Sequence, residues 1–161
     1  MYEGDKLIDG AVDTLNLLLK DFKIKYLTNT STRSRKLIFK KLLQFKLPLS
    51  ESDIFSPSIA ASIFLKKRNI SKIFLLANPQ LSDDFKEFKI DKNGSSAIVI
   101  GDLHKKFSWE CLNEAFQIVS KNDALIIALH KNKYCKRENK ISLDLGPFVV
   151  ALEYATSKKS I

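Results

Sequence analysis

The sequence lacks the features that would place it in a membrane or a secretory pathway. No apolar run approaches the roughly 20 residues that a membrane-spanning helix needs. The stretch Met1-Tyr2-Glu3-Gly4-Asp5 is too acidic and too poor in apolar side chains for a signal peptide. The two cysteines, Cys111 and Cys135, lack the C-x-x-C spacing of a redox or zinc site. We therefore expect a cytoplasmic protein with no membrane partner.

Glycine is also scarce, with five residues in a chain of 161, and none of them forms a nucleotide-binding glycine loop. The sequence contains no internal repeat and no low-complexity tract. Hydrophobic residues make up 45% and charged residues 28% of the chain, as in ordinary folded proteins. We expect one domain, or one domain with a fragment of a second.

The net charge of +9 raises the question of nucleic-acid binding. The basic residues gather in two places, the stretch 131–140 and one side of a predicted helix that carries Arg33, Arg35, Lys36, Lys40 and Lys41. Aromatic residues are not interleaved with them as stacking platforms. Solvated helix faces explain this pattern with fewer assumptions, so no nucleic-acid partner is predicted.

Helices and strands alternate along the chain. Apolar residues at helical spacing predict helices over residues 10–21, 32–45, 57–67, 109–120 and 146–156. Asp9 is expected to cap the first helix and Ser56 the third, and Trp109 to pack at the start of the fourth. Short apolar runs predict strands over residues 24–27, 72–77, 97–100 and 124–129. This order predicts an α/β fold with helices on a small parallel sheet, and the polar stretch 49–53 could mark a domain boundary.

The most informative stretch follows the first predicted strand and holds Thr28, Asn29 and Thr30. A strand that ends in hydroxyl groups and free backbone N–H groups before a helix can bind a phosphate. In the alternative, Thr30 or Ser31 caps the helix and nothing binds. The local sequence leaves both interpretations open.

The segments IDGAVDTLNLL, KYLTNTSTRSRKLIFKKL, SESDIFSPSIAA, AIVIGDLHKKFSWECLNEAF, ALIIALHKNKYCKR and LDLGPFVVALEYATSKK together resemble the haloacid dehalogenase superfamily of phosphatases. The resemblance implies a Rossmann-like core with an inserted α/β cap domain. Residues 1–47 would then be a partial core of helix, strand and helix. Residues 48–157 would be the cap, and residues 158–161 the start of the return to the core.

The resemblance also implies four catalytic motifs, of which this chain holds the second. That motif binds the transferred phosphoryl group and maps to Thr28, with Asn29 beside it. The other three are a D-x-D or D-x-S nucleophile strand, a lysine in G-K-P, and an acidic G-D-D run that holds Mg²⁺. The chain is expected to begin after the nucleophile strand and to end before the G-K-P strand.

Two functions are compatible with this pattern. By family, the chain resembles a Mg²⁺-dependent phosphatase of small phosphorylated molecules. Without a nucleophile, the G-K-P lysine or metal ligands, it is predicted to be inactive alone. The alternative is a non-catalytic binding or interaction module derived from the cap. A core with a single strand would expose its edges, so self-association is also possible.

Two segments imitate the missing motifs. The run Leu143-Asp144-Leu145-Gly146 has one Asp, no preceding apolar strand and Pro147 where a Thr should follow, so we interpret it as the turn into the last helix. The run Ile98-Val99-Ile100-Gly101-Asp102 resembles the magnesium motif, but lysines follow where another carboxylate is needed. No metal ligand and no catalytic residue is therefore assigned to this chain.

Lys131 and Lys133 follow the strand predicted over residues 124–129. The resemblance implies that this part of the cap approaches the core and helps to select the substrate. Both lysines are therefore candidate substrate contacts, and the alternative is a solvated basic loop. His104 and His130 lack a spaced metal-ligand partner, so we expect surface or core histidines.

Overall fold

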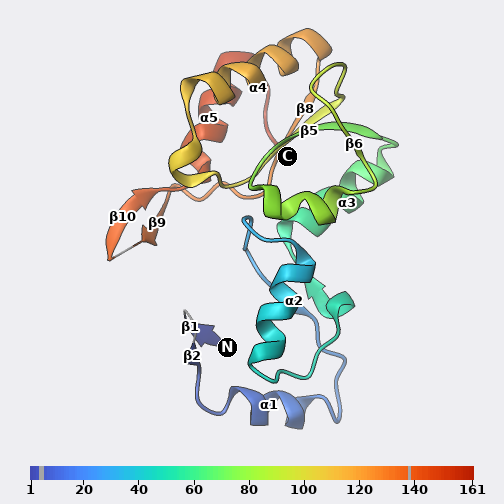
Figure 1. Ribbon diagram of the computed structural model, residues 1–161, viewed down its shortest axis with the longest axis vertical. Helices are drawn as coiled ribbons and strands as arrows, with labels where there is room; N and C mark the ends of the chain where they lie inside the picture. The colour runs from blue at the N-terminus through green and yellow to red at the C-terminus, as the bar shows by residue number, and fades with distance from the viewer. Residues whose placement is uncertain (4–5, 138) are drawn as a thin grey trace.

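The computed structural model describes residues 1–3, 6–137 and 139–161. The chain forms a smaller and a larger body, with the N-terminus in the first and the C-terminus in the second (Figure 1). The smaller body comprises β1 (Tyr2–Glu3), β2 (Lys6–Leu7), α1 (Ala11–Leu18), β3 (Tyr26–Leu27), α2 (Arg35–Gln44) and β4 (Ile54–Phe55). The larger body comprises α3 (Pro57–Lys67), β5 (Lys72–Leu76), β6 (Lys89–Ile90), β7 (Ala97–Ile100), α4 (Trp109–Asn122), β8 (Leu125–Ala128), β9 (Tyr134–Arg137), β10 (Lys140–Leu143) and α5 (Leu145–Thr156). Three short 3-10 helices complete the structure: η1 (Glu51–Asp53), η2 (Pro79–Phe85) and η3 (His104–Lys106).

The larger body is built on a four-stranded parallel sheet with the strand order β6-β5-β7-β8. Helices α4 and α5 cover one face, where Ile98 and Ile100 are buried. Helix α3 and η2 cover the other, where Ala97 and Val99 are buried. Because both faces are covered, every residue of β7 is apolar and inaccessible to solvent. This sheet confirms the predicted α/β class.

The smaller body has a two-stranded parallel sheet, β3 and β4, in which Tyr26 pairs with Ile54 and Leu27 with Phe55. Tyr26 and Ile54 are buried against α2, in a core that also contains Leu15, Ile38, Leu42 and Leu47. Strand β4 lies beyond residue 47, so this sheet takes one strand from each side of the predicted domain boundary. The division into residues 1–47, 48–157 and 158–161 stays a prediction. At the other end of the chain, Ile161 pairs with β8 through backbone hydrogen bonds to Ile126 and Ala128.

Helix α3 and strand β7 have the predicted bounds, and Ser56 caps α3 by accepting a hydrogen bond from the Ile59 N–H. The predicted Asp9 cap of α1 is wrong. The cap position is Gly10, which has φ 75° and makes no side-chain capping bond. A positive φ favours glycine, so a glycine and not a carboxylate residue occupies the position before α1.

Two elements were not predicted, and one further expectation is wrong. Strand β4, which was not predicted, forms directly after the polar stretch 49–53, because Ile54 fills the core beneath β3. The hairpin of β9 and β10 was not predicted, because its apolar residues Ile141 and Leu143 are exposed and give no core signal. Trp109 begins α4 but is 73% exposed, so it does not pack as expected. None of the helices over the described residues is long and apolar enough to cross a membrane.

Asp84 on η2 joins the two bodies. Its carboxylate accepts hydrogen bonds from the Arg35 N–H at 3.1 and 3.0 Å and from the Ser58 hydroxyl at 2.6 Å. Burial raises the pKa of Asp84, while the hydrogen bonds from Ser58 and Arg35 act in the opposite direction. Since the N-terminus of a helix attracts an anion, Asp84 anchors the start of α2 to the larger body.

We expect Asp84→Ala to destabilise the chain by about 1–3 kcal/mol, because it removes the carboxylate that binds the start of α2 and leaves the Arg35 N–H without an acceptor. Urea unfolding followed by circular dichroism measures the change. Asp83→Ala, at the exposed neighbouring residue, is the matched control and should change stability by less than about 0.5 kcal/mol. Equal midpoints for the two variants would contradict this role of Asp84.

Candidate phosphoryl-binding site

Thr28 lies directly after β3, where the chain leaves the sheet. Its N–H donates to the Phe55 carbonyl at 3.1 Å, which extends the pairing with β4. Its hydroxyl oxygen accepts from the Thr30 N–H at 3.2 Å and lies 2.9 Å from the Thr30 hydroxyl. The two hydroxyl groups thus close a compact turn in which Asn29 is exposed.

Helix α2 begins at Arg35, later than predicted, and Ser34 is its N-cap. The alternative in which Thr30 or Ser31 caps the helix is therefore wrong, because Ser34 accepts the hydrogen bond from the Leu37 N–H. The Arg35 N–H is already bound by Asp84, so it is not available to a ligand. Any phosphate site here would have to come from the loop before the helix.

That loop offers backbone donors. Within the described residues, the N–H groups of Asn29 and Ser31 have no hydrogen-bond acceptor. Together with the hydroxyl groups of Thr28 and Thr30, they make a short run of polar groups at the end of a parallel strand. Such groups can hold a phosphoryl oxygen.

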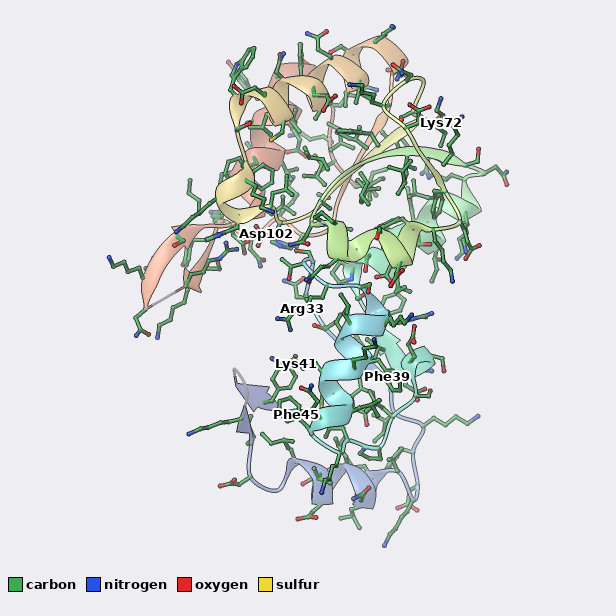
Figure 2. All side chains as sticks on the ribbon, in the orientation of Figure 1. Arg33, Phe39, Lys41, Phe45, Lys72 and Asp102 are labelled. Atoms are coloured by element: carbon green, nitrogen blue, oxygen red, sulfur yellow. The ribbon has the colours of Figure 1, made fainter. Side chains whose placement is uncertain are left out.

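The loop faces the carboxyl end of the larger sheet. A Cβ added to Gly101, which follows β7, would lie 3.1 Å from the Ser31 carbonyl oxygen and 2.9 Å from the Ala77 side chain. Glycine therefore permits this close approach of the two bodies. In Figure 2, Asp102 lies at the edge of the larger body that faces the smaller one, and Arg33 lies across from it. Ligands of open α/β sheets bind outside the carboxyl ends of the strands, which is where this loop lies.

Ionisable groups surround that edge, and the two aspartates among them are buried. Arg137 of β9 places its Nη2 atom 2.5 Å from the Asp102 carboxylate and 3.7 Å from that of Asp144. His130 Nε2 lies 3.8 Å from Asp144, and the His104 N–H donates to Asp102 at 2.7 Å. We call Asp102, His130, Arg137 and Asp144 the acidic cluster. Its carboxylates are already bound, so neither is free to act as a nucleophile.

The acidic cluster was not predicted from the sequence, since its members are far apart in the chain and meet only through the hairpin. Asp144 also caps α5 by accepting from the Leu145 N–H at 3.0 Å, which confirms the turn predicted there. His130 lies near Asp144, a neighbour that the sequence spacing did not indicate. Burial raises the pKa of the neighbouring Cys135 thiol, and the charges of Asp144 and Asp102 act in the same direction.

The two candidate cap lysines have different surroundings. The Lys131 ammonium lies 2.9 and 3.0 Å from the two Glu153 oxygens, and Glu153 also accepts from the N–H and hydroxyl of Ser160. The bond to Lys131, followed by that to the Ser160 N–H, lowers the pKa of Glu153 to about 2. Lys133 is exposed and has no ion pair among the described residues. The two lysines therefore differ, because Lys131 is paired with Glu153 whereas Lys133 is exposed. A substrate contact by either lysine stays a prediction.

The haloacid dehalogenase-like hydrolase family model matches residues 1–91. The chain belongs to this family. It is 33% identical over 158 residues to haloacid dehalogenase-like hydrolase domain-containing protein 2 of Rattus norvegicus, covering 98% of this chain and 60% of that protein. It is 30% identical over 159 residues to the human phospholysine phosphohistidine inorganic pyrophosphate phosphatase, covering 98% and 58%. The chain therefore spans about three fifths of the length of these curated relatives.

Solved structures of the family agree with the fold. The p-nitrophenyl phosphatase from Archaeoglobus fulgidus matches 97% of this chain and 61% of its own, with a TM-score of 0.87 and 21% identity. The 4-nitrophenylphosphatase from Thermotoga maritima matches 99% and 62%, with a TM-score of 0.85 and 26% identity. The glycerol phosphate phosphatase from Mycobacterium tuberculosis, solved in complex with magnesium, matches 98% and 49%, with a TM-score of 0.83 and 20% identity. The haloacid dehalogenase-like fold extends over nearly the whole chain.

Proposed function

We propose that this chain carries the phosphoryl-binding loop and the cap of a phosphatase that acts on a small phosphorylated molecule. The observation that supports this is the Thr28–Thr30 turn at the end of β3, where the N–H groups of Asn29 and Ser31 have no acceptor among the described residues. Its position opposite the carboxyl ends of the larger sheet supports the same function. We also propose that the protein acts in the cytoplasm. Cys111 and Cys135 are free thiols, which is usual for proteins of a reducing compartment.

The family suggests Mg²⁺ as a cofactor, but the described residues of this chain do not fit it. Among the described residues, no group of three His, Cys, Asp or Glu side chains could hold a metal ion. Asp102, whose surroundings in the sequence resemble the metal motif, is bound by Arg137. We therefore propose that this chain binds a phosphoryl group but does not hydrolyse it alone.

The binding half of this proposal is tested by titrating inorganic phosphate into the ¹⁵N-labelled chain. We expect the amide signals of Asn29 and Ser31 to shift. In Thr28→Ala the affinity should fall about 10- to 100-fold, the range for a lost hydrogen bond to a charged group. Thr14→Ala, at an exposed residue of α1, should bind as the wild type does. Shifts confined to lysine-rich helix faces, or unchanged in Thr28→Ala, would refute the site.

The second half is tested in a turnover assay with p-nitrophenyl phosphate and Mg²⁺. We expect no hydrolysis above that of the buffer, because no nucleophile is assigned. Mg²⁺-dependent turnover that disappears in Thr28→Ala would overturn the predicted inactivity while supporting the site.

A further inference from the structure

The segment over residues 28–50 is strongly basic. It contains no acidic residue and six basic ones, Arg33, Arg35, Lys36, Lys40, Lys41 and Lys46. Two of them, Arg35 and Lys36, lie in the first turn of α2, which has no acidic residue. The N-terminal end of a helix dipole disfavours cations, and the like charges of Lys36 and Lys40, four residues apart, repel each other. The charges of α2 therefore oppose its own stability, a local conflict that is expected at functional sites.

A groove of about 390 Å³ follows one side of α2, and we call it the basic groove. It is lined by Arg33, Leu37, Lys40, Lys41, Gln44 and Gln80. Residues 33, 37, 40 and 44 are three or four positions apart and continue along one side of the helix. In Figure 2, Arg33 and Lys41 lie on one side of α2 and Phe39 on the other. Gln80 belongs to η2, and its carbonyl accepts a hydrogen bond from the Ser34 N–H at 3.0 Å. Both bodies therefore line the basic groove.

The charge of the basic groove has one sign. In the described part of the chain, no carboxylate lines it. Arg33 and Lys40 are exposed, and neither pairs with an acidic residue that the structure describes. A second groove beside α2 is different, because carboxylates line it and Glu51 lies 3.6 Å from the Arg35 Nε atom. In the basic groove, the charges of Arg33 and Lys40 are left for a ligand to balance.

We propose that the basic groove binds a linear chain of phosphate groups, as in tripolyphosphate or the triphosphate of a nucleotide, and that this ligand contacts both bodies. Arg33 precedes α2 and Lys40 lies in its second turn, so their backbones are about 10 Å apart along the helix axis. A chain of several phosphates fits this spread of charge better than a single phosphate does. The guanidinium group of Arg33 can bind phosphate oxygens in a bidentate manner, and Lys40 contributes a point charge. The side-chain amides of Gln44 and Gln80 supply further N–H donors.

The composition of the groove also defines what it does not recognise. No aromatic residue lines it, so a nucleobase would find no stacking platform there. We therefore expect tripolyphosphate and ATP to bind with similar affinity. The basic groove does not include residues 28–31 of the phosphoryl-binding loop, so this proposal is independent of the proposed function.

The test titrates tripolyphosphate into the ¹⁵N-labelled full chain. We expect the side-chain amide signals of Gln44 and Gln80 to shift and to saturate, with an affinity that falls as salt is added. The double variant Arg33→Gln with Lys40→Gln should bind at least about tenfold more weakly, because two charge-assisted contacts are lost. The variant relieves the repulsion between Lys36 and Lys40, so weaker binding would not reflect a destabilised helix. Circular dichroism verifies that the helix is intact.

The matched control is the double variant Lys20→Gln with Lys23→Gln, which makes the same change in net charge. Both lysines follow α1, are exposed and have no ion pair among the described residues. This variant should bind tripolyphosphate as the wild type does. Equal weakening in the two double variants would overturn the proposal, because the attraction would then come from net charge alone. A wild type that does not bind tripolyphosphate would overturn it as well.

Gln80→Ala tests the contact with the larger body. We expect tripolyphosphate to bind about 2- to 10-fold more weakly, the range for a lost neutral hydrogen bond. Unchanged affinity would contradict a ligand that contacts both bodies.

Other ligands separate the proposal from its alternatives. ATP that binds at least tenfold more tightly than tripolyphosphate would contradict recognition of the phosphate chain alone. Tighter binding of a single-stranded oligonucleotide, lost in Arg33→Gln with Lys40→Gln, would replace the proposal with nucleic-acid binding. Shifts at Gln44 and Gln80 without phosphate-induced shifts at Asn29 and Ser31 would refute the proposed function and support the basic groove. The reverse pattern would support the proposed function and overturn the basic groove.

Discussion

Arg137→Leu is expected to destabilise the chain by about 3–5 kcal/mol, because the variant leaves two buried carboxylates without their shared cation. The side chains of Asp102 and Asp144 are 10% and 6% exposed, so water cannot replace the guanidinium group. Arg137 also ties the hairpin of β9 and β10 to the larger sheet. We therefore expect the hairpin to lose protection from hydrogen exchange before the sheet does.

Urea unfolding of the wild type and the variant measures this effect. Lys136→Leu, on the same strand, is the matched control, because Lys136 is exposed and has no ion pair among the described residues. Its stability should change by less than about 0.5 kcal/mol. Adding Asp102→Asn to Arg137→Leu should restore part of the loss, since it removes one uncompensated charge. An Arg137→Leu variant as stable as Lys136→Leu would contradict a stabilising role of this buried ion pair.

The elements that could be predicted from the sequence are those whose signal is local. Strand β7 is fully apolar because both of its faces are covered. The start of α3 is marked by Ser56 as the N-cap and Pro57 as the first helical residue. Strand β4 has only two residues, and its pairing with β3 depends on a partner far away in the sequence. The hairpin of β9 and β10 turns at Asn139, which has φ 60°, but its exposed face gives no periodic signal.

The candidate site divides in the same way. The Thr28–Thr30 loop was predicted because it follows a strand and carries hydroxyl groups in sequence. The acidic cluster could not be predicted, because Asp102 and Arg137 meet only after the larger sheet and the hairpin have formed. Glu153, which lies on α5 and binds Lys131, also gave no signal, since a helical glutamate ordinarily faces water.

The Lys131–Glu153 pair should make the stability of the chain depend on pH below about 5. Glu153 is buried, and its pKa in the folded chain is lowered from 4.5 to about 2, mainly by Lys131. A lowered pKa adds stability that is fully present above the unfolded value and is lost as the pH falls through the folded one. The difference corresponds to at most about 3 kcal/mol at neutral pH.

We expect the free energy of unfolding of Glu153→Gln at pH 7 to be lower than that of the wild type by up to about 3 kcal/mol. This difference should shrink as the pH falls from 5 to 2. Urea unfolding at a series of pH values gives the two curves, and their difference removes the contribution of other carboxylates. Glu87→Gln breaks the exposed pair with Lys66 and is the matched control, with a much smaller effect. Parallel curves for wild type and Glu153→Gln would show that Lys131 is not held by Glu153. Its ammonium would then be available to a substrate, whereas the expected result leaves Lys133 as the cap lysine that can reach one.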